Sequence, residues 1–398
     1  MINGFPRGSE ISTFCPGGAR SNIVDFKVVK DAFAEALIQG VFPGAVLLVG
    51  RGEEIVCEYA FGSRSLVPTS SPMQTNTIFD IASLTKPLAT TVGVMLLVNE
   101  KTIGLKDLVT QFFPAFGSSG KNEISVRHLL NHSSGLPAWK PYYLDVVESE
   151  RQGKTNFVAS GTAKQYVFEQ ICRETPIGEP GVESLYSDLG FIVLGEILEA
   201  VSGKPLDRFC QERIFKPLDL RSTFFVDLTQ LSTQQFQPME EMIAPTEDCP
   251  WRRKVLCGEV HDDNAYVMGG VAGHAGLFSS ARDIHRLLAL LNSCLRGENS
   301  FLPQSLIQEF LTKDRSVKNS TYALGWDTPS ENHSSSGKYF SAHSVGHLGF
   351  TGTSIWWDLE KNCHVVLLSN RVHPSRTNEK IKEFRPYIHD LIMKTLNP

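Results

Sequence analysis

The sequence lacks the features that would assign the protein to a membrane, to export or to nucleic acid. No apolar run approaches the roughly 20 residues needed to span a bilayer, and the first 20 residues contain no apolar core of the kind that a secretory signal needs. The chain has 38 Lys and Arg against 43 Asp and Glu, without the basic stripe that favours a phosphate backbone. We therefore expect a cytoplasmic protein with no membrane span and no nucleic-acid partner.

Motifs for metals, redox chemistry and nucleotides are also missing. The eight cysteines are scattered without a C-x-x-C pair, which argues against zinc and redox sites and favours free thiols. A bridge between Cys249 and Cys257 is the alternative if the protein is exported. The run His261-Asp262-Asp263-Asn264 is interpreted as a structural loop, and the glycine-rich segment 269–279 lacks the spacing of a dinucleotide site. We expect no metal and no organic cofactor.

The composition is that of a folded protein with a large core, since hydrophobic residues make up 41% of the 398 residues and charged residues 20%. Both ends of the chain contain short β-rich runs beside a predicted helix. In the first helix, Val28 and Phe33 belong to the expected apolar stripe, and in the last helix Pro386 is a candidate break. The elements predicted at the two ends are a helix over 28–39, strands over 45–49, 55–61, 353–357 and 364–369, and a helix over 381–396.

Between the ends, the pattern predicts mostly helices and loops. Strands at both ends favour an α+β fold, with one antiparallel sheet built from both chain ends, flanked by helices, and a large helical lobe inserted. An active site is expected in the cleft between the lobes. The central helices are predicted over 88–98, 126–131, 163–172, 187–201 and 282–295. The expected divisions are a tail over 1–22, an α/β lobe over about 23–82 and 303–398, and a helical lobe over about 83–302.

The segment Ser83-Leu84-Thr85-Lys86 opens the most apolar predicted helix and places a serine and a lysine on one face. A serine hydroxyl is a poor nucleophile unless a neighbour takes its proton, and a lysine at a helix N-terminus can have its pKa lowered enough to help. The spacing alone is weak evidence, because a helix cap followed by a solvated lysine gives the same pattern.

Two further boxes strengthen this interpretation. Tyr186-Ser187-Asp188 begins another predicted helix, and His347-Leu348-Gly349 precedes a predicted strand. The order S-x-x-K, Y-x-[N or D], [K or H]-x-G, with intervals of about 100 and about 160 residues, is typical of active-site serine acyl-transferases.

With these boxes, the sequence resembles the serine hydrolases that include class C β-lactamases, D-alanyl-D-alanine peptidases, D-aminopeptidases and β-lactamase-like (family VIII) carboxylesterases. The resemblance covers nearly the whole chain after the tail and includes segments 128–136, 269–279 and 347–354. It implies a β-lactamase/transpeptidase-like fold and an enzyme that forms an acyl-enzyme.

The resemblance also implies roles for individual residues. Ser83 would be the nucleophile, Lys86 its proton partner, and Tyr186 the phenol that passes a proton to the leaving group and later activates water. The backbone N–H groups of Ser83 and Phe350 would hold the oxyanion of the tetrahedral intermediate, an interaction worth about 3 kcal/mol per donor.

Two positions depart from the family pattern. His347 stands where penicillin-recognising members usually carry a lysine that attracts substrate carboxylates, and Asp188 stands where they usually carry asparagine. Together these residues make the site less positive by up to about two charge units. We expect neutral esters, neutral amides or amine-bearing substrates to be preferred. Asp188 is also expected to keep Lys86 as an ammonium ion, which shifts the base role toward Tyr186. The alternative role for Asp188 is a cap of the helix that follows, and both roles can hold together.

Other candidate substrate contacts are softer. Gly349 is carried over with the third box, and His274 lies in the glycine-rich segment, which also fits a tight loop beside the cleft. Aromatic residues could line an apolar acyl pocket, with plain core packing as the alternative. These aromatic candidates are Trp139, Phe350, Trp356 and Trp357.

We therefore expect an esterase or amidase that acts on a small-molecule ester, amide or peptide-like substrate, with weak or no β-lactamase activity. One alternative is a D-alanyl-D-alanine carboxypeptidase or β-lactamase acting on peptidoglycan-type substrates. Another is a catalytically silent relative that binds a ligand in the same cleft. The joint presence of Ser83, Lys86 and Tyr186 argues against the silent relative.

Overall fold

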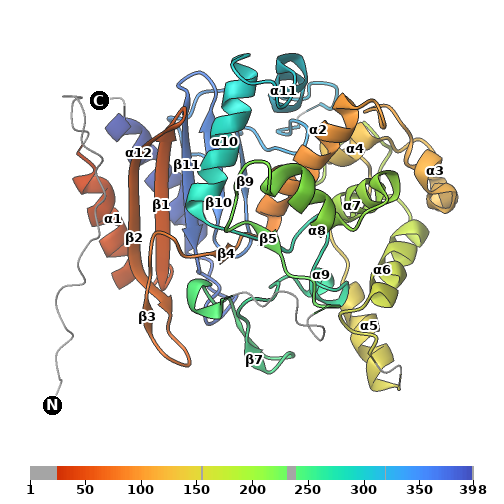
Figure 1. Cartoon of the computed structure of the whole chain (residues 1–398), viewed down its shortest axis with the longest axis horizontal. Coiled ribbons are helices and arrows are strands. Elements are labelled where there is room, and N and C mark those ends of the chain that lie inside the picture. Colours follow the sequence, from red (N-terminus) through yellow and green to blue (C-terminus); the bar gives the residue numbers. More distant parts are fainter. Residues whose placement is uncertain (1–24, 154–155, 231–238, 319, 397–398) are drawn as a thin grey trace.

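The centre of the molecule is a six-stranded antiparallel sheet in the order β3-β2-β1-β11-β10-β9 (Figure 1). The computed structural model describes residues 25–153, 156–230, 239–318 and 320–396, so the predicted tail over 1–22 lies outside the described residues. β1, near the N-terminus, pairs with β11, near the C-terminus, with Ala45 opposite Ser369. The predicted sheet built from both chain ends is confirmed. Its strands are β1 (Gly44–Arg51), β2 (Glu54–Ser65), β3 (Ser71–Pro72), β9 (Ser344–Leu348), β10 (Ser354–Asp358) and β11 (Cys363–Ser369).

Helices cover both faces of this sheet, because alternate residues of its strands point to opposite sides. Leu47 and Val49 of β1 pack in a core with α1 (Lys27–Ile38) and α12 (Ile381–Leu396). Val46 and Leu48 of β1 belong to a larger core that is shared with the helical part. The two cores place the sheet between the terminal helices and the helical part, as Figure 1 shows.

The two terminal helices differ in detail from the prediction. In α1 the buried residues include Val29 and Phe33, whereas Val28 is 57% exposed. The predicted apolar stripe was therefore wrong at Val28. α12 continues through Pro386, whose neighbours Phe384 and Ile388 on either side are both anchored in the core.

The middle of the chain holds short strands as well as the predicted helices. β4 (Phe79–Asp80), β8 (Leu277–Ser279) and β5 (Phe224–Phe225) form a three-stranded sheet, and β6 (Asp248–Cys249) pairs with β7 (Lys254–Val255). Strands of two or three residues show no periodicity, which is why sequence patterns gave only helices and loops here.

The five helices predicted in the middle are present with bounds that agree to within a few residues, whereas α3, α5, α8, α9 and α11 were not predicted. The predicted helix over 88–98 begins with a π-helical turn, Lys86–Thr91, and α10 packs against β1 and β11 of the large sheet. The remaining helices are α2 (Val92–Asn99), α3 (Val109–Phe112), α4 (Val126–Leu130), α5 (Tyr142–Arg151), α6 (Gly161–Arg173), α7 (Asp188–Ser202), α8 (Leu206–Cys210), α9 (Asp263–Val267), α10 (Ala281–Leu295) and α11 (Gln304–Leu311).

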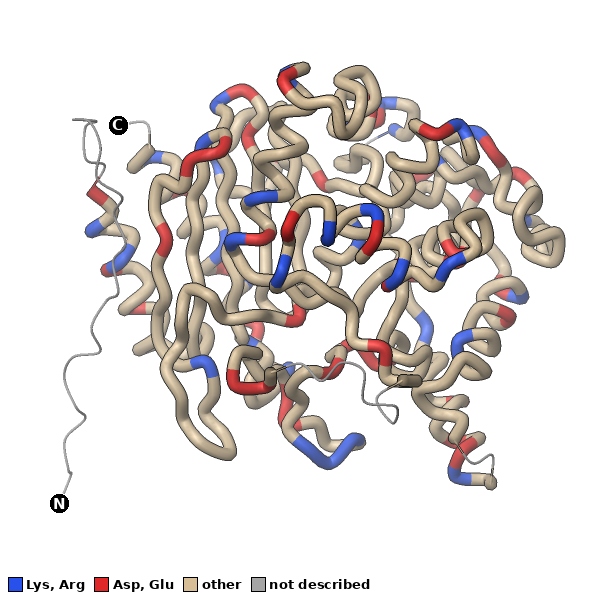
Figure 2. The backbone as a smooth tube through the Cα atoms, viewed as in Figure 1, with Lys and Arg blue, Asp and Glu red and all other residues tan. Residues whose placement is uncertain are grey.

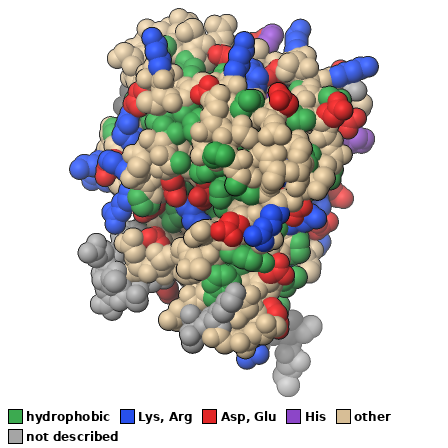
Figure 3. Space-filling view, turned by 90° about the vertical axis from the view of Figure 1, so that its right-hand side faces the viewer, with side chains coloured by type: hydrophobic (Ala, Val, Ile, Leu, Met, Phe, Trp, Pro, Cys, Tyr) green, Lys and Arg blue, Asp and Glu red, His purple; other side chains and the backbone are tan. Residues whose placement is uncertain are grey.

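Charged residues of both signs are interspersed over the outer helices and loops, with few on the central strands (Figure 2). The face formed by the helical part carries Lys and Arg beside Asp and Glu, with apolar side chains scattered between them (Figure 3). No helix in the described part of the chain is long and apolar enough to cross a bilayer.

Candidate active site

The S-x-x-K segment begins where the short strand β4 ends. Asp80, the last residue of β4, is buried, and its two carboxylate oxygens accept hydrogen bonds from the N–H groups of Ala82 (2.8 Å) and His261 (2.6 Å). Ala82 has a φ of +49°, a conformation that is costly for a residue with a Cβ. Asp80 therefore helps to hold the strained residue that precedes Ser83.

Lys86 is fully buried and lies close to Ser83. Its Nζ donates to Ser83 Oγ at 3.0 Å, to Asp188 Oδ1 at 2.7 Å and to the backbone carbonyl of His274 at 3.0 Å. An ammonium group has three N–H donors, so these acceptors satisfy it fully. The structure brings together the serine and the lysine of one segment and the aspartate of another.

Asp188 decides the charge of Lys86. Burial alone would lower the pKa of this lysine, but the Asp188 carboxylate and the Tyr186 phenol outweigh burial and raise the pKa above its ordinary value. The ion pair is shielded from solvent, because the side chain of Lys86 is 0% exposed and that of Asp188 is 17% exposed. Lys86 is an ammonium ion at neutral pH, in agreement with the expectation drawn from Asp188.

The Tyr186 phenol lies beside both Ser83 and Lys86. The Lys86 Nζ is 4.9 Å from the centroid of the tyrosine ring. Burial raises the pKa of Tyr186, while the charge of Lys86 and hydrogen bonding to Lys86 and Ser83 act in the opposite direction. The phenol therefore keeps its proton at neutral pH. If that proton leaves, the adjacent Lys86 ammonium stabilises the phenolate that forms.

Ser187 caps α7, so the alternative role considered for Asp188, a cap of this helix, does not apply. Ser187 Oγ accepts a hydrogen bond from the N–H of Gly190, whereas Asp188 is the first residue of the helix. The physical reason is that the Asp188 carboxylate reaches Lys86 instead.

The turn after β9 is locked against the turn that carries the nucleophile. An ideal Cβ on Gly349 would lie 2.0 Å from Thr353 Oγ1 and 2.6 Å from the carbonyl oxygen of Ile81, so a side chain does not fit. The Thr353 hydroxyl donates to the Ile81 carbonyl at 3.1 Å, and the Gly349 N–H donates to the Thr353 carbonyl at 2.7 Å. These contacts fix the third box relative to Ser83.

His347 contributes no positive charge to the site. Its buried ring approaches that of Tyr186, with 5.9 Å between centroids, and its Nδ1 contacts the carbonyl of Leu348 at 2.9 Å. Burial and, to a lesser extent, the nearby Lys86 charge lower the pKa of His347 to about 3. The imidazole is therefore neutral at pH 7, as expected when it replaces a lysine.

The two backbone N–H groups expected to hold an oxyanion remain available to a ligand. Ser83 and Phe350 both line one cavity, and among the described residues neither N–H has a protein acceptor. The ring of Phe350 is 52% exposed and stacks on the ring of His261, with 5.6 Å between centroids.

The three boxes meet at this cavity, which has a volume of about 620 Å³. The exposed ring of Trp139 forms part of its wall, and cationic residues from the C-terminal region, Arg371, Arg376 and Arg385 among them, form another part. The predicted site residues that line the cavity are Ser83, Trp139, Tyr186, Asp188, His347, Gly349 and Phe350.

His274 is buried and is not among the residues that line the cavity. Its Nε2 is hydrogen-bonded to Asp262 Oδ1 at 3.0 Å, and its backbone carbonyl accepts from Lys86. Gly270 and Gly276 of the same segment have φ values of +87° and +110°. The glycine-rich segment is therefore a tight loop, the alternative considered from the sequence, and it contacts the lysine through its backbone.

Trp356 and Trp357 do not belong to an acyl pocket. They alternate along β10, so that Trp356 lies in the core with α1 and α12 and Trp357 in the larger core, both fully buried. For these two residues the alternative of plain core packing is correct, because both faces of the sheet are covered.

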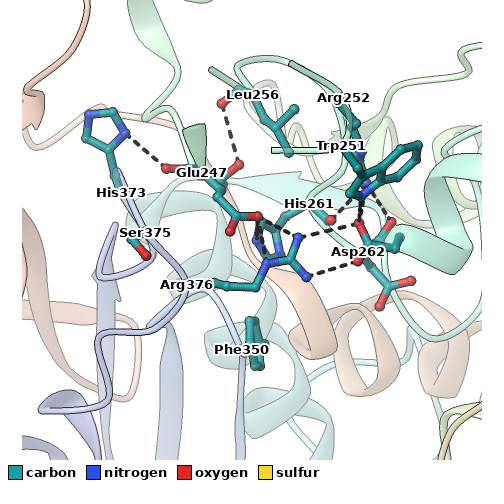
Figure 4. Close-up of polar contacts among 12 residues, drawn as sticks. Glu247, Trp251, Arg252, Leu256, His261, Asp262, Phe350, His373, Ser375 and Arg376 are labelled. Atoms are coloured by element: carbon teal, nitrogen blue, oxygen red, sulfur yellow. Dashed lines mark hydrogen bonds and ion pairs between the residues drawn. The ribbon is translucent and has the colours of Figure 1, made fainter. Parts of the chain in front are cut away.

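A buried ion network backs the cavity on the side of Phe350 (Figure 4). Arg376 pairs with Glu247 at 2.5 Å and with Asp263 at 2.9 Å, while Asp262 caps α9. The run 261–264, interpreted from the sequence as a structural loop, is a loop only at His261 and Asp262, because Asp263 and Asn264 form the first turn of α9. Within the described ranges, no group of three potential metal ligands comes together.

Sequence reasoning missed several residues that shape the site. The N–H of Ser187 donates to His132 Nδ1 at 3.1 Å, and burial lowers the pKa of this histidine, which keeps its ring neutral. The His132 ring lies 4.7 Å from that of Tyr186. Segment 128–136 carried the family resemblance and was the available signal for His132, but no pattern marked Asp80 or Arg385.

Comparisons with known proteins show which proteins this chain is similar to. The sequence profile described as Beta-lactamase matches residues 29–385. A Salmonella typhimurium protein named as a candidate D-alanyl-D-alanine carboxypeptidase is 31% identical over 373 residues, which cover 88% of this chain and 84% of that protein.

Solved structures share the fold at lower identity. EstCE1, described as a hydrolase with promiscuous acyltransferase activity, has a TM-score of 0.67 and 22% identity, with 90% of this chain and 98% of that chain covered. The octameric penicillin-binding protein homologue from Pyrococcus abyssi has a TM-score of 0.68 and 21% identity, with 93% of this chain and 78% of that chain covered. Simvastatin synthase (LovD) from Aspergillus terreus has a TM-score of 0.70 and 16% identity, with 95% of this chain and 100% of that chain covered.

Proposed function

Because this chain belongs to the beta-lactamase family, we propose that it is a serine hydrolase that cleaves an ester or amide through an acyl-enzyme on Ser83. The observation that carries the proposal is the position of Lys86 Nζ, 3.0 Å from Ser83 Oγ and 2.7 Å from Asp188 Oδ1. This arrangement places an ammonium ion beside a serine in the wall of a substrate-sized cavity, where it stabilises the Tyr186 phenolate that would take the serine proton.

The residues of the site account for both halves of the reaction. The reactive form is the one in which Tyr186 has lost its proton and its phenolate is stabilised by the Lys86 ammonium. Ser83 Oγ bonds to the substrate carbonyl carbon as its proton passes to this phenolate, and the N–H groups of Ser83 and Phe350 hold the oxyanion. The C–O or C–N bond then breaks, and the leaving group takes a proton from Tyr186. A water molecule attacks the acyl-enzyme in the same way, which releases the carboxylic acid and restores Ser83.

The charges at the reacting centre support a preference for neutral esters, neutral amides or amine-bearing substrates over penicillins. His347 is neutral, and the charge of Lys86 is paired with Asp188. The cation Arg376 in the outer wall is paired with Glu247 and Asp263. None of these groups offers the unpaired ammonium that attracts a substrate carboxylate in other members of the family. Arg371 and Arg385 of the cavity wall form no ion pair among the described residues, but their guanidinium groups donate to backbone carbonyls of the turn after β9.

A D-alanyl-D-alanine carboxypeptidase or β-lactamase is the second candidate, favoured by the name of the 31%-identical Salmonella relative. A silent relative that only binds its ligand is disfavoured, because Ser83, Lys86 and Tyr186 lie in contact rather than apart.

The proposal is tested by the hydrolysis of p-nitrophenyl acetate, an activated ester that reacts without specific recognition. We expect turnover by the wild type and by Ser305→Ala, which changes an exposed serine of α11, and no turnover by folded Ser83→Ala. Mass spectrometry of the quenched reaction should show the acyl group on Ser83. Equal rates in the wild type and Ser83→Ala would refute the proposal.

A further inference from the structure

Arg385 is joined to the backbone of the third box from a different element, α12. Its Nη2 donates to the carbonyl of Gly349 at 2.8 Å and to the carbonyl of Thr353 at 2.9 Å. The Gly349 carbonyl and the Phe350 N–H belong to the same peptide unit. Arg385 therefore contacts one end of the peptide whose other end carries a proposed oxyanion donor.

The positive charge of Arg385 is not cancelled by a carboxylate. The side chain lines the cavity but is only 6% exposed, and within the described residues it forms no ion pair. Burial, together with the nearby Arg371, lowers the pKa of Arg385 to about 9. Arg376 in the same wall differs, since Glu247 and Asp263 neutralise it.

A peptide unit is conjugated, so a hydrogen bond to its oxygen withdraws electron density from its nitrogen and makes its N–H a better donor. A charged donor strengthens this effect, because charge-assisted hydrogen bonds are roughly twice as strong as neutral ones. The benefit is largest when negative charge develops on the substrate oxygen, which is the condition for lowering the barrier rather than tightening substrate binding.

We propose that Arg385 is a positioning residue of the oxyanion hole, which holds the Gly349–Phe350 peptide and polarises it through the Gly349 carbonyl. The inference rests on the proposed function, since it requires an acyl-enzyme on Ser83 whose oxyanion contacts the Phe350 N–H. It adds a cation that acts through the backbone in a site whose third box lacks one.

Arg371 provides the matched comparison. It also lines the cavity and holds the same turn, but it donates to the carbonyl of Phe350, with Nε at 2.9 Å and Nη2 at 2.5 Å, and thus to the next peptide unit. If Arg385 only held the turn in place, its replacement should affect the reaction as replacement of Arg371 does. Only Arg385 donates to the peptide unit that contains the Phe350 N–H, so only its replacement should weaken that donor.

The test compares the wild type, Arg385→Gln and Arg371→Gln with p-nitrophenyl acetate labelled with ¹³C at the carbonyl carbon. Intact mass spectrometry first establishes acylation of Ser83. We expect Arg385→Gln to lower kcat about tenfold with KM within about twofold, less than the hundredfold or greater loss when a whole donor is removed. Its acyl-enzyme carbonyl stretch should move to higher frequency, and its affinity for phenylboronic acid should fall about as much as kcat. Arg371→Gln should leave the stretch unchanged.

Each outcome decides the proposal. An unchanged carbonyl stretch in folded Arg385→Gln, or equal shifts in both variants, would overturn it, even if kcat falls. If Arg385→Gln does not fold, Arg385→Lys replaces it and should give a smaller shift in the same direction, while no shift would overturn the proposal. A wild type that forms no acyl-enzyme would instead overturn the proposed function, and this inference with it.

Discussion

The Lys86 ammonium and the Asp188 carboxylate lie 2.7 Å apart, although the two residues are separated by 102 positions in the chain. The charged group beside Ser83 is therefore an ion pair and not an isolated cation. Removal of one partner would leave the other charge buried and unpaired, which is why this contact affects stability as well as chemistry.

Asp188→Asn should change how stability depends on pH. In the wild type the folded-state pKa of Lys86 is raised, so its contribution to stability is fully present below about pH 10 and is lost as pH rises through the folded value. Without the carboxylate, burial lowers the pKa of Lys86, and the variant should instead gain stability as pH rises toward 10. We expect a loss of about 3 kcal/mol at pH 7.

Urea denaturation at pH 6, 8 and 10 measures this effect. Asp31→Asn is the control, because Asp31 forms only an exposed pair with Lys27. Parallel stability curves for Asp188→Asn and the wild type would show that Asp188 does not set the charge of Lys86.

His347→Lys should improve the binding of substrates that carry a carboxylate. The new ammonium would stand at the third box, where the wild-type imidazole is neutral. We expect KM for benzylpenicillin to fall about tenfold, the effect of one partly screened charge interaction, with KM for a neutral p-nitrophenyl ester within about twofold. His347→Gln, which stays neutral, should not lower KM for benzylpenicillin. The same decrease in both variants would argue against a charge effect.

Asp80→Asn should weaken both the fold and the reaction. One carboxylate oxygen would become an amide donor facing the N–H of Ala82 or His261, so a buried hydrogen bond is lost at a cost of about 2 kcal/mol. The turn that positions Ser83 would relax, and kcat should fall. Adding Ala82→Gly removes the strain of the positive φ and should recover stability but not kcat. A variant with reduced stability and unchanged kcat would exclude a role of Asp80 in positioning Ser83.

Glu196→Gln should stabilise the protein at alkaline pH. Glu196 lies on α7, and burial raises its pKa to about 7 despite the opposing charge of Lys164. Because the folded-state pKa of this carboxyl group is raised, its contribution to the free energy of unfolding falls as pH rises from about 4.5 to 7. We expect the variant to gain up to about 3 kcal/mol at pH 8 and nothing at pH 4, with Lys164 still paired to Glu199. Equal free energies of unfolding for Glu196→Gln and the wild type at pH 8 would contradict this prediction.

The sheet strands near both chain ends could be predicted because their side chains alternate over several residues. β1 shows this, since Leu47 and Leu48 enter different cores. β4 could not be predicted, because two residues carry no period, and its pairing depends on β8 from a distant part of the chain. Local patterns also do not settle which residue of a first turn is buried or which residue caps a helix, as Val28 of α1 and Ser187 of α7 show.

The reacting groups could be predicted because each lies in a short motif whose residue types suit the chemistry. The groups that hold them could not, since their contacts arise only in the folded chain. Arg385 reaches a carbonyl 36 positions away, and Asp80 contacts an N–H 181 positions away. Single residues of this kind have no spacing that could distinguish them from other buried or exposed charges.

The pairing of β1 with β11 has a consequence for synthesis on the ribosome. β1 and β2 emerge early and can form their hairpin, but the partner of β1 on its other side arrives only with residues 363–369. Until then that strand edge stays open to pairing with other chains. A truncation before residue 363 would leave the hairpin permanently unpaired on this side, so nascent or shortened chains should depend on chaperones far more than the finished protein.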